Sequence, residues 1–162
     1  MVLIKVTDDN EWYTPKYLVD YFGKFDYDPA SNDYWAEILQ IPNYDTKETD
    51  GLKTDWTKYK RIWINPPFTQ KKEFLAKAVE TYSKVKNDIY ILLPINFLVT
   101  KLFSKNFIGG EIWIPDTRIK FTNGSGKKTS QSPAFGHVVI KIQDGNNKYH
   151  LIKMDDLESQ KI

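Results

Sequence analysis

The sequence contains no cysteine and no long hydrophobic run among its 162 residues. Without cysteine the chain has no disulfide, no thiolate metal site and no thiol nucleophile, which excludes cytosine C5 methylation through a cysteine adduct. Its longest apolar runs, such as residues 89–94, are far shorter than the roughly 20 residues that cross a bilayer. Residues 1–12 show neither a basic leader nor a cleavage site. We therefore expect no membrane contact, no signal peptide and a cytoplasmic location.

The composition predicts one globular domain that spans residues 1–162. Hydrophobic residues make up 41% and charged residues 27%, which is typical of folded soluble chains rather than of disordered tails. The net charge is +2 but is unevenly divided: residues 1–60 hold seven Lys and Arg against twelve Asp and Glu, and residues 61–162 hold 16 against nine. The basic second part fits an anionic partner and fits an ordinary solvated surface equally well.

Short runs rich in β-branched and aromatic residues alternate with helical patterns. The expected strands cover residues 2–6, 25–28, 61–65, 89–94, 111–114, 138–142 and 149–153. The clearest helix covers residues 71–85, where apolar side chains recur with a helical period. A second helix is expected to begin with Thr14 as its cap and Pro15 in the first helical position, and to end at Gly23. Shorter helices are expected within residues 32–41 and 98–107.

The alternation of helices and strands predicts an α/β fold with a mainly parallel sheet. The last two strands, separated by residues 144–147, are expected to pair as a C-terminal antiparallel hairpin. Only about thirty residues separate the strand at 25–28 from the strand at 61–65, too few for two further strand and helix units. We therefore expect a sheet that is trimmed on that side, with ligands bound beyond the carboxyl ends of its parallel strands.

The strongest motif is Asn65-Pro66-Pro67-Phe68, which directly follows an expected strand. Two consecutive prolines fix the backbone and remove both N–H donors, so the loop presents carbonyl groups. Asn65 adds a side-chain acceptor, and Phe68 adds a flat apolar face. Such a loop suits a planar ring with an exocyclic amine, because it holds both N–H bonds while the nitrogen lone pair faces an electrophile. The alternative is a structural turn in which Asn65 caps its own backbone.

This tetrapeptide resembles the Asn-Pro-Pro-aromatic motif of S-adenosylmethionine-dependent amino-methyltransferases. The order of further segments is similar to that of the phage-type DNA N-6-adenine methyltransferases, the Dam-like family. These segments are residues 11–15, 28–31, 50–52, 55–56, 61–68, 92–94, 118–121 and 132–135. The resemblance implies a Rossmann-like class I methyltransferase sheet, S-adenosylmethionine as the cofactor and double-stranded DNA as the substrate.

The resemblance also implies which residues hold the cofactor. Residues 12–15 match the segment that borders the methionine end of the cofactor, and residues 28–31 occupy the place of its first binding loop. Asp55 resembles the carboxylate that accepts a hydrogen bond from the cofactor's adenine. The implied cofactor-binding residues are Trp12, Thr14, Pro15, Asp28, Pro29, Ala30, Ser31 and Asp55.

Each of these segments has a structural alternative. Residues 12–15 also suit a helix start, residues 28–31 suit an Asp-Pro turn, and Asp55 suits an N-cap. The chain departs from the pattern of many methyltransferases at one point, since no Gly-x-Gly loop follows Asp28. The position of the cofactor therefore stays open at this stage.

Basic residues in the second part of the chain are the candidate contacts to DNA phosphates. Two follow the Asn-Pro-Pro-Phe loop, and the others lie in or beside the Gly- and Ser-containing stretch at residues 117–133. The candidates are Lys71, Lys72, Arg118, Lys120, Lys127 and Lys128. A solvated surface loop is the alternative for any such lysine pair. We expect His137 and His150 to be strand residues and expect no metal site, since neither histidine has a partner at metal-ligand spacing.

Together these features predict methyl transfer from S-adenosylmethionine to the N6 amino group of adenine in DNA, by direct in-line attack after base flipping. In this interpretation Asn65 and the Pro66 carbonyl accept the two amine protons, and Phe68 stacks on the base. Two alternatives stay open. One is a methyltransferase for another planar amine, such as RNA adenine, cytosine N4 or a protein amide. The other is an inactive nucleic-acid-binding protein of the same fold.

Overall fold

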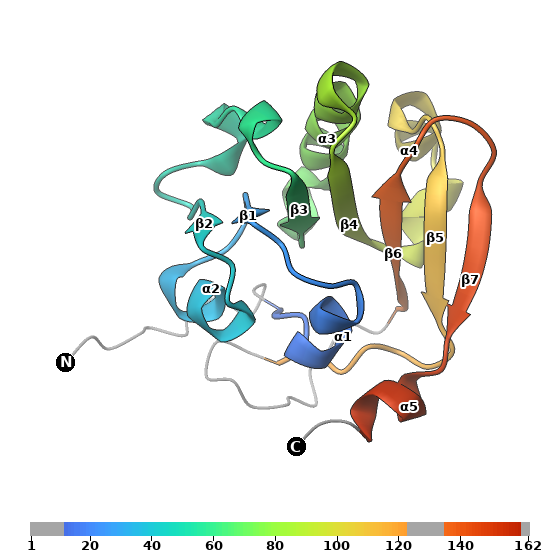
Figure 1. Cartoon of the computed structure of the whole chain (residues 1–162). Coiled ribbons are helices and arrows are strands. Elements are labelled where there is room, and N and C mark those ends of the chain that lie inside the picture. The colour runs from blue at the N-terminus through green and yellow to red at the C-terminus, as the bar shows by residue number, and fades with distance from the viewer. Residues whose placement is uncertain (1–11, 123–134, 160–162) are drawn as a thin grey trace.

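The computed structural model describes residues 12–122 and 135–159, and within these ranges seven strands form one mixed sheet. The strands stand in the order β2 (Asn43–Tyr44), β1 (Tyr27–Asp28), β3 (Arg61–Ile64), β4 (Asp88–Pro94), β6 (His137–Ile142), β5 (Gly110–Pro115) and β7 (Lys148–Ile152). The first four strands in this order are mutually parallel. β6 runs antiparallel to both of its neighbours, and β7 runs parallel to β5. The predicted α/β fold with a mainly parallel sheet is confirmed (Figure 1).

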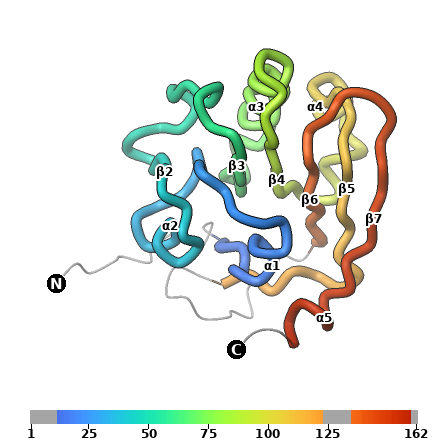
Figure 2. The backbone as a smooth tube through the Cα atoms, viewed as in Figure 1, coloured from blue at the N-terminus to red at the C-terminus, as the bar shows by residue number. Residues whose placement is uncertain are grey.

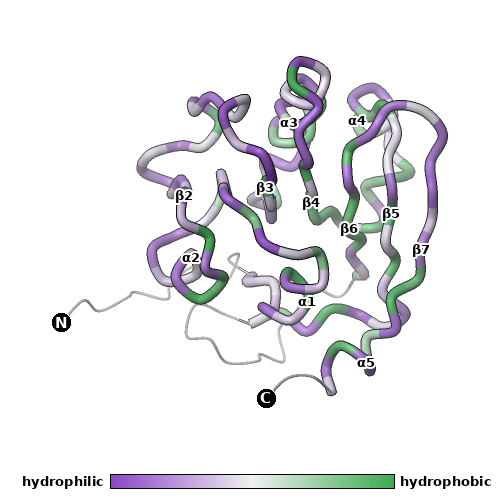
Figure 3. Tube along the Cα trace, in the orientation of Figure 1, coloured by the Kyte–Doolittle hydropathy of each residue, from purple (hydrophilic) through white to green (hydrophobic). Residues whose placement is uncertain are grey.

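Helices cover both faces of the sheet, so its central strands are buried on two sides (Figure 1). α3 (Lys71–Val85) and α4 (Lys101–Asn106) pack on one face, and α1 (Lys16–Tyr21), α2 (Asp33–Leu39) and α5 (Met154–Glu158) lie on the other. Successive residues of β3 alternate between the two cores: Ile62 and Ile64 pack with α3, whereas Trp63 packs with α1 and α2. Hydrophobic residues gather on β4 and β6, while the edge strand β7 is hydrophilic over much of its length (Figure 3).

The helix expected at residues 71–85 is confirmed as α3. The helix expected to begin at Thr14 begins at Lys16 instead, and Gly23 follows its end with a φ of +98°. Pro15 stands in the N-cap position with an extended backbone, and no side chain caps the first turn. The prediction of Thr14 as the cap is therefore wrong. The helix expected at residues 98–107 is divided into the 3₁₀ helix η4 (Ile95–Val99) and α4.

Between β1 and β3 the chain holds one α-helix and one two-residue strand, as the short spacing predicts. α2 follows Asn32, whose side-chain oxygen accepts a hydrogen bond from the Trp35 N–H at 2.8 Å. Two 3₁₀ helices, η1 (Gly51–Lys53) and η2 (Trp56–Lys58), then lead into β3. A Cβ on Gly51 would stand 1.9 Å from the Pro29 carbonyl oxygen, so only glycine lets η1 pack against the turn after β1.

The C-terminal strands pair differently from the expected hairpin. β5 separates β6 from β7, so the antiparallel strand β6 pairs with β4 and β5, and β7 pairs in parallel with β5. The connection at residues 143–147 crosses the start of β5. There a Cβ on Gly109 would lie 2.3 Å from the Gly145 carbonyl oxygen. The prediction that the last two strands pair with each other is wrong because this short turn steps over an intervening strand.

Segments that are distant in sequence meet at one edge of the sheet (Figure 2). The Tyr13 N–H donates to the Thr122 carbonyl at 2.9 Å, and the Thr122 N–H donates to the Tyr13 carbonyl at 3.1 Å. α5 packs beside α1. Within the described ranges, no helix combines the length and the apolar character needed to cross a membrane. The strand expected at residues 2–6 lies outside the described residues.

Candidate active site

A cleft of about 740 Å³ opens at the carboxyl edge of the parallel strands, where ligands are expected to bind in such a sheet. Its volume lies within the range of small-molecule sites. Asp28 ends β1, Asn65 follows β3 and Pro94 ends β4, and all three residues line the cleft. The structure brings eleven of the predicted site residues to this cleft: Trp12, Thr14, Asp28, Pro29, Ala30, Ser31, Asn65, Pro66, Pro67, Phe68 and Lys71.

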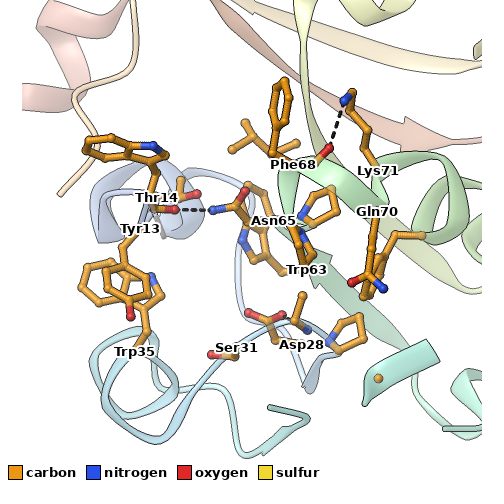
Figure 4. Close-up of a pocket in the computed structure, with 18 of the residues that line it drawn as sticks. Tyr13, Thr14, Asp28, Ser31, Trp35, Trp63, Asn65, Phe68, Gln70 and Lys71 are labelled. Carbon is orange, nitrogen blue, oxygen red and sulfur yellow. Dashed lines mark hydrogen bonds between the residues drawn. The ribbon is translucent and has the colours of Figure 1, made fainter. Parts of the chain in front are cut away.

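The amide of Asn65 is held between the Asp28 side and the Phe68 side of the cleft (Figure 4). Its Nδ2 donates a hydrogen bond to the Trp12 backbone carbonyl at 2.7 Å. Because a carbonyl oxygen only accepts, this bond identifies the two ends of the amide and leaves Oδ1 as an acceptor. No donor in residues 12–122 or 135–159 is bonded to Oδ1. Asn65 therefore offers a positioned acceptor to a molecule in the cleft.

Phe68 stands at the rim of the cleft, on the 3₁₀ helix η3 (Phe68–Gln70), and is 56% exposed. Lys71 Nζ donates to the Phe68 carbonyl at 2.9 Å and lies 3.8 Å from the Phe68 ring centroid (Figure 4). This cation over the ring face restricts the position of Phe68. The Phe135 ring is tilted by 35° to the Phe68 ring, with the two centroids 6.0 Å apart. Two aromatic rings and one ammonium group thus form a single rim.

Asp28 is a buried carboxyl at the end of β1, 3% exposed and facing the cleft. Its Oδ1 accepts a hydrogen bond from the Ala30 N–H at 2.9 Å. Burial raises the pKa of Asp28 from 3.8 to about 7, and the bond from Ala30 offsets only part of that effect. No basic side chain of the described residues is paired with it. A buried carboxylate with no cationic side chain paired to it favours a ligand that brings a positive charge.

Three polar atoms of cleft-lining residues are buried without a hydrogen-bond partner among the described residues. They are the Thr14 hydroxyl, the Trp35 indole N–H and Nδ1 of His137. Folded proteins leave few buried polar atoms unpaired, so such atoms in the wall of a cleft indicate a bound molecule that pairs with them. The cleft therefore has the features of a site that a polar ligand completes.

Trp35 is fixed in this wall by its neighbours. Its backbone N–H is bonded to Asn32, and the Asn32 amide also donates to the Tyr13 hydroxyl. The Tyr13 ring stacks on the indole with the centroids 4.7 Å apart and the planes 20° apart. The indole N–H therefore stands at the cleft on a side chain that has little freedom to turn.

Two predicted cofactor residues lie outside the cleft lining. Pro15 is buried at the start of α1. Asp55 is exposed, and its Oδ1 accepts bonds from the Thr57 N–H at 3.0 Å and from the Thr57 hydroxyl at 2.6 Å. This geometry matches the N-cap alternative for Asp55. The acidic residue that does line the cleft from this region is Asp50, which caps η1 through the Leu52 N–H.

The predicted DNA-binding residues are spread over several places. Lys71 lines the cleft, and Lys72 lines a second hollow beside it. Arg118 is exposed, and Lys120 is exposed with its Nζ 2.9 Å from Glu158 Oε2. Lys127 and Lys128 lie outside the described residues. Among the residues that are described, no cluster of His, Asp and Glu is placed to hold a metal ion.

Several residues that line the cleft were not among the predicted site residues, and Trp35, Phe135 and His137 are three of them. Burial lowers the pKa of His137 to about 4, so its ring is neutral near pH 7. The ring stands edge-on to Phe121 with the centroids 4.9 Å apart. Phe135 lies in the segment 132–135 that carries part of the resemblance, which was the available signal for it.

A family model and two individual proteins that are similar to this chain all carry the description DNA N-6-adenine-methyltransferase. The family model described as "DNA N-6-adenine-methyltransferase (Dam)" matches residues 3–160. A DNA N-6-adenine-methyltransferase of Escherichia phage T1 is 31% identical over 147 residues, covering 87% of this chain and 60% of the relative. A DNA N-6-adenine-methyltransferase of Haemophilus phage HP1 (strain HP1c1) is 27% identical over 136 residues, covering 79% of this chain and 76% of the relative. The chain thus spans about three fifths of the phage T1 relative.

Proposed function

The chain belongs to the DNA N-6-adenine-methyltransferase (Dam) family, and from this premise we propose that it transfers a methyl group from S-adenosylmethionine to the N6 amino group of adenine in DNA. The observation that carries the proposal is Oδ1 of Asn65, which accepts no hydrogen bond from the described residues. The bond from Nδ2 to the Trp12 carbonyl holds this amide in position at the cleft. An amide acceptor beside an exposed aromatic ring fits a base with an exocyclic amine. The names of the two relatives favour adenine as that base.

The cleft residues fit S-adenosylmethionine. Asp28 would bind the ammonium group, because its buried carboxylate lacks a cation among the described residues. The Thr14 hydroxyl and the Trp35 indole N–H would donate to the carboxylate group, because both are buried and neither has a partner within residues 12–122 and 135–159. When bound, S-adenosylmethionine supplies an activated methyl group on a positively charged sulfur. The Asp28 turn and Asn65 line the same cleft, so donor and acceptor would meet within it.

The protein's part in the reaction is to expose and orient the amine. Adenine N6 is inaccessible inside a duplex, so the target base leaves the stack and enters the cleft. Asn65 Oδ1 and the Pro66 carbonyl would accept the two N6–H bonds, which directs the nitrogen lone pair at the methyl group. Phe68 would stack on the base. Positioning and electrostatic stabilisation then lower the barrier, and no general base with an unusual pKa is required.

Double-stranded DNA is the proposed partner, and the cytoplasm of a bacterial host is the proposed location. Lys71 and Lys72 lie at or beside the cleft and would contact phosphates. Arg118 is exposed and would add a further contact. The salt dependence of binding reports such contacts, because each neutralised phosphate releases counterions.

The test is incubation of the purified protein with unmethylated duplex DNA and labelled S-adenosylmethionine, followed by nucleoside analysis. We expect N6-methyl-2'-deoxyadenosine from the wild type and none from Asn65→Ala. The variant should still bind S-adenosylmethionine in calorimetry, because the residues proposed to hold it are unchanged.

Asn87→Ala is the matched control. The Asn87 amide also donates to a backbone carbonyl, that of Tyr59 at 3.0 Å, but lies outside the cleft lining. This control should methylate DNA normally. Near-normal turnover by Asn65→Ala would refute the assignment of Asn65, and N4-methylcytosine as the product would refute the choice of adenine.

A further inference from the structure

A second hollow of about 390 Å³ adjoins the cleft. Phe68, Lys71 and Pro94 line both, so the two hollows share a wall. One wall of the second hollow is formed by η3 and the start of α3. The other wall is formed by η4 and the start of α4, and Asn96 and Thr100 belong to it. We call this second hollow the flanking groove.

The surface at the flanking groove is basic. Lys71 and Lys72 line it, and the exposed Lys101 follows the lining residue Thr100 directly. Residues 95–106 contain two lysines and no acidic residue. Glu73 is the one acidic residue among those that line the groove. This charge balance suits an anionic partner such as the phosphate backbone of DNA.

The same surface also exposes apolar side chains. Val99 is 87% exposed, and Ile95 and Leu102 are each exposed by more than two fifths. Three exposed aliphatic side chains on one short segment are unusual on a surface that has no partner. Proteins that open or bend a duplex place apolar side chains against unstacked bases, next to basic side chains that hold the backbone. The flanking groove supplies basic side chains, and the segment at residues 95–102 along its wall supplies the exposed apolar ones.

We propose that the flanking groove is a second DNA-binding subsite, which holds the nucleotide next to the everted adenine on the same strand. The inference rests on the proposed function, because a base bound in the cleft forces its strand to cross the cleft rim. Phe68 and Lys71 form the part of the rim that leads directly into the groove. Lys101 then faces a phosphate of that strand, and Val99 packs against the base pair left open by the eversion.

The contribution of charge is tested by measuring how tightly Lys101→Ala binds an unmethylated duplex that the wild type methylates. We expect affinity about fivefold weaker than that of the wild type, and a plot of log K against log salt with a slope smaller by about 1. Lys148→Ala, an exposed lysine on the edge strand β7, is the control and should bind as the wild type does.

The apolar contribution is tested with Val99→Ser on two substrates. On a normal duplex we expect methylation about tenfold slower than with the wild type. On a duplex whose target adenine faces an abasic site, the loss should be about twofold, because that adenine is already unpaired. Leu151→Ser on β7 removes a side chain that is 65% exposed and should change neither rate.

The outcomes separate this inference from the proposed function. If the wild type methylates DNA but Lys101→Ala and Val99→Ser behave like their controls, the flanking groove is refuted and the proposed function stands. A dimer of the wild type that Val99→Ser dissociates would also refute it, by assigning the surface to a second copy of the chain. If the wild type neither binds nor methylates DNA, the proposed function itself fails.

Discussion

Replacing Asp28 by Asn should stabilise the empty protein at neutral pH and remove its affinity for S-adenosylmethionine. Asp28 is buried in the cleft wall without a cation among the described residues. Asn keeps an oxygen that accepts the Ala30 N–H bond, and it carries no charge for burial to disfavour. The same change deletes the negative charge that we assign to the ammonium group of the cofactor.

The size of the effect follows from the pKa of Asp28, which burial raises from 3.8 to about 7. A carboxyl with a raised pKa binds its proton more tightly in the folded chain than in the unfolded chain. The stability it contributes is therefore complete below about pH 4 and is lost as the pH rises through 7. The total loss is about 4 kcal/mol, and about 2.5 kcal/mol of it falls between pH 5 and pH 8.

Urea unfolding of the wild type and of Asp28→Asn from pH 5 to pH 8 measures this loss. The difference between the two curves isolates Asp28, because His137 and the other titrating groups are common to both proteins. The variant should gain stability relative to the wild type as the pH rises. A difference that does not change with pH would refute the reasoning on burial. A variant that is more stable but still binds S-adenosylmethionine tightly would refute the assignment of Asp28 to the ammonium group.

Two further substitutions probe the walls of the cleft. Gly51→Ala should destabilise the fold by about 3 kcal/mol in urea unfolding, because the added Cβ would overlap the Pro29 carbonyl. Gly136→Ala is the control and should cost far less, because its Cβ would lie 3.8 Å from the nearest atom, and equal losses would contradict the close approach at Gly51. Trp35→Phe should retain the stack on Tyr13 and the stability of the fold, but should weaken S-adenosylmethionine binding about tenfold in calorimetry. An unchanged dissociation constant would show that the indole N–H has no ligand partner.

The features that the sequence predicted well are those that local chemistry determines. The apolar period of residues 71–85 specifies α3 without help from the rest of the chain. Consecutive prolines after a buried strand specify a stiff loop, and Asn65 and Phe68 stand at the cleft on that loop. Both predictions depend on fewer than twenty adjacent residues.

The pairing of the last strands could not be read locally. The turn at residues 143–147 has the length and composition of a hairpin, and nothing within it shows that β5 lies between the strands it connects. That arrangement depends on Gly109, more than thirty residues earlier, where the absence of a side chain makes room for the turn. Strand order is a property of the whole sheet, whereas a turn motif reports only its own geometry.

The different positions of Asp50 and Asp55 relative to the cleft could not be read from the local sequence either. Each of these carboxylates caps a 3₁₀ helix by accepting a backbone N–H two residues later. Their local sequences therefore carry the same structural signal. Asp50 lines the cleft because its neighbour Gly51 packs on Pro29 and brings η1 against the turn after β1. A single close contact between distant segments thus decides which acid lies in the site.

The missing Gly-x-Gly loop has a physical explanation in the same contacts. The wall beside Asp28 is assembled from three separate segments, residues 12–14, 28–35 and 46–51, rather than from one glycine-rich turn. Gly51 supplies the close backbone approach from outside the loop, at the Pro29 carbonyl. The bond from Asn65 Nδ2 to the Trp12 carbonyl then ties the loop assigned to the base directly to the wall assigned to the cofactor. Because this bond positions the Asn65 amide, a shift of the cofactor wall changes the position of the amine acceptor.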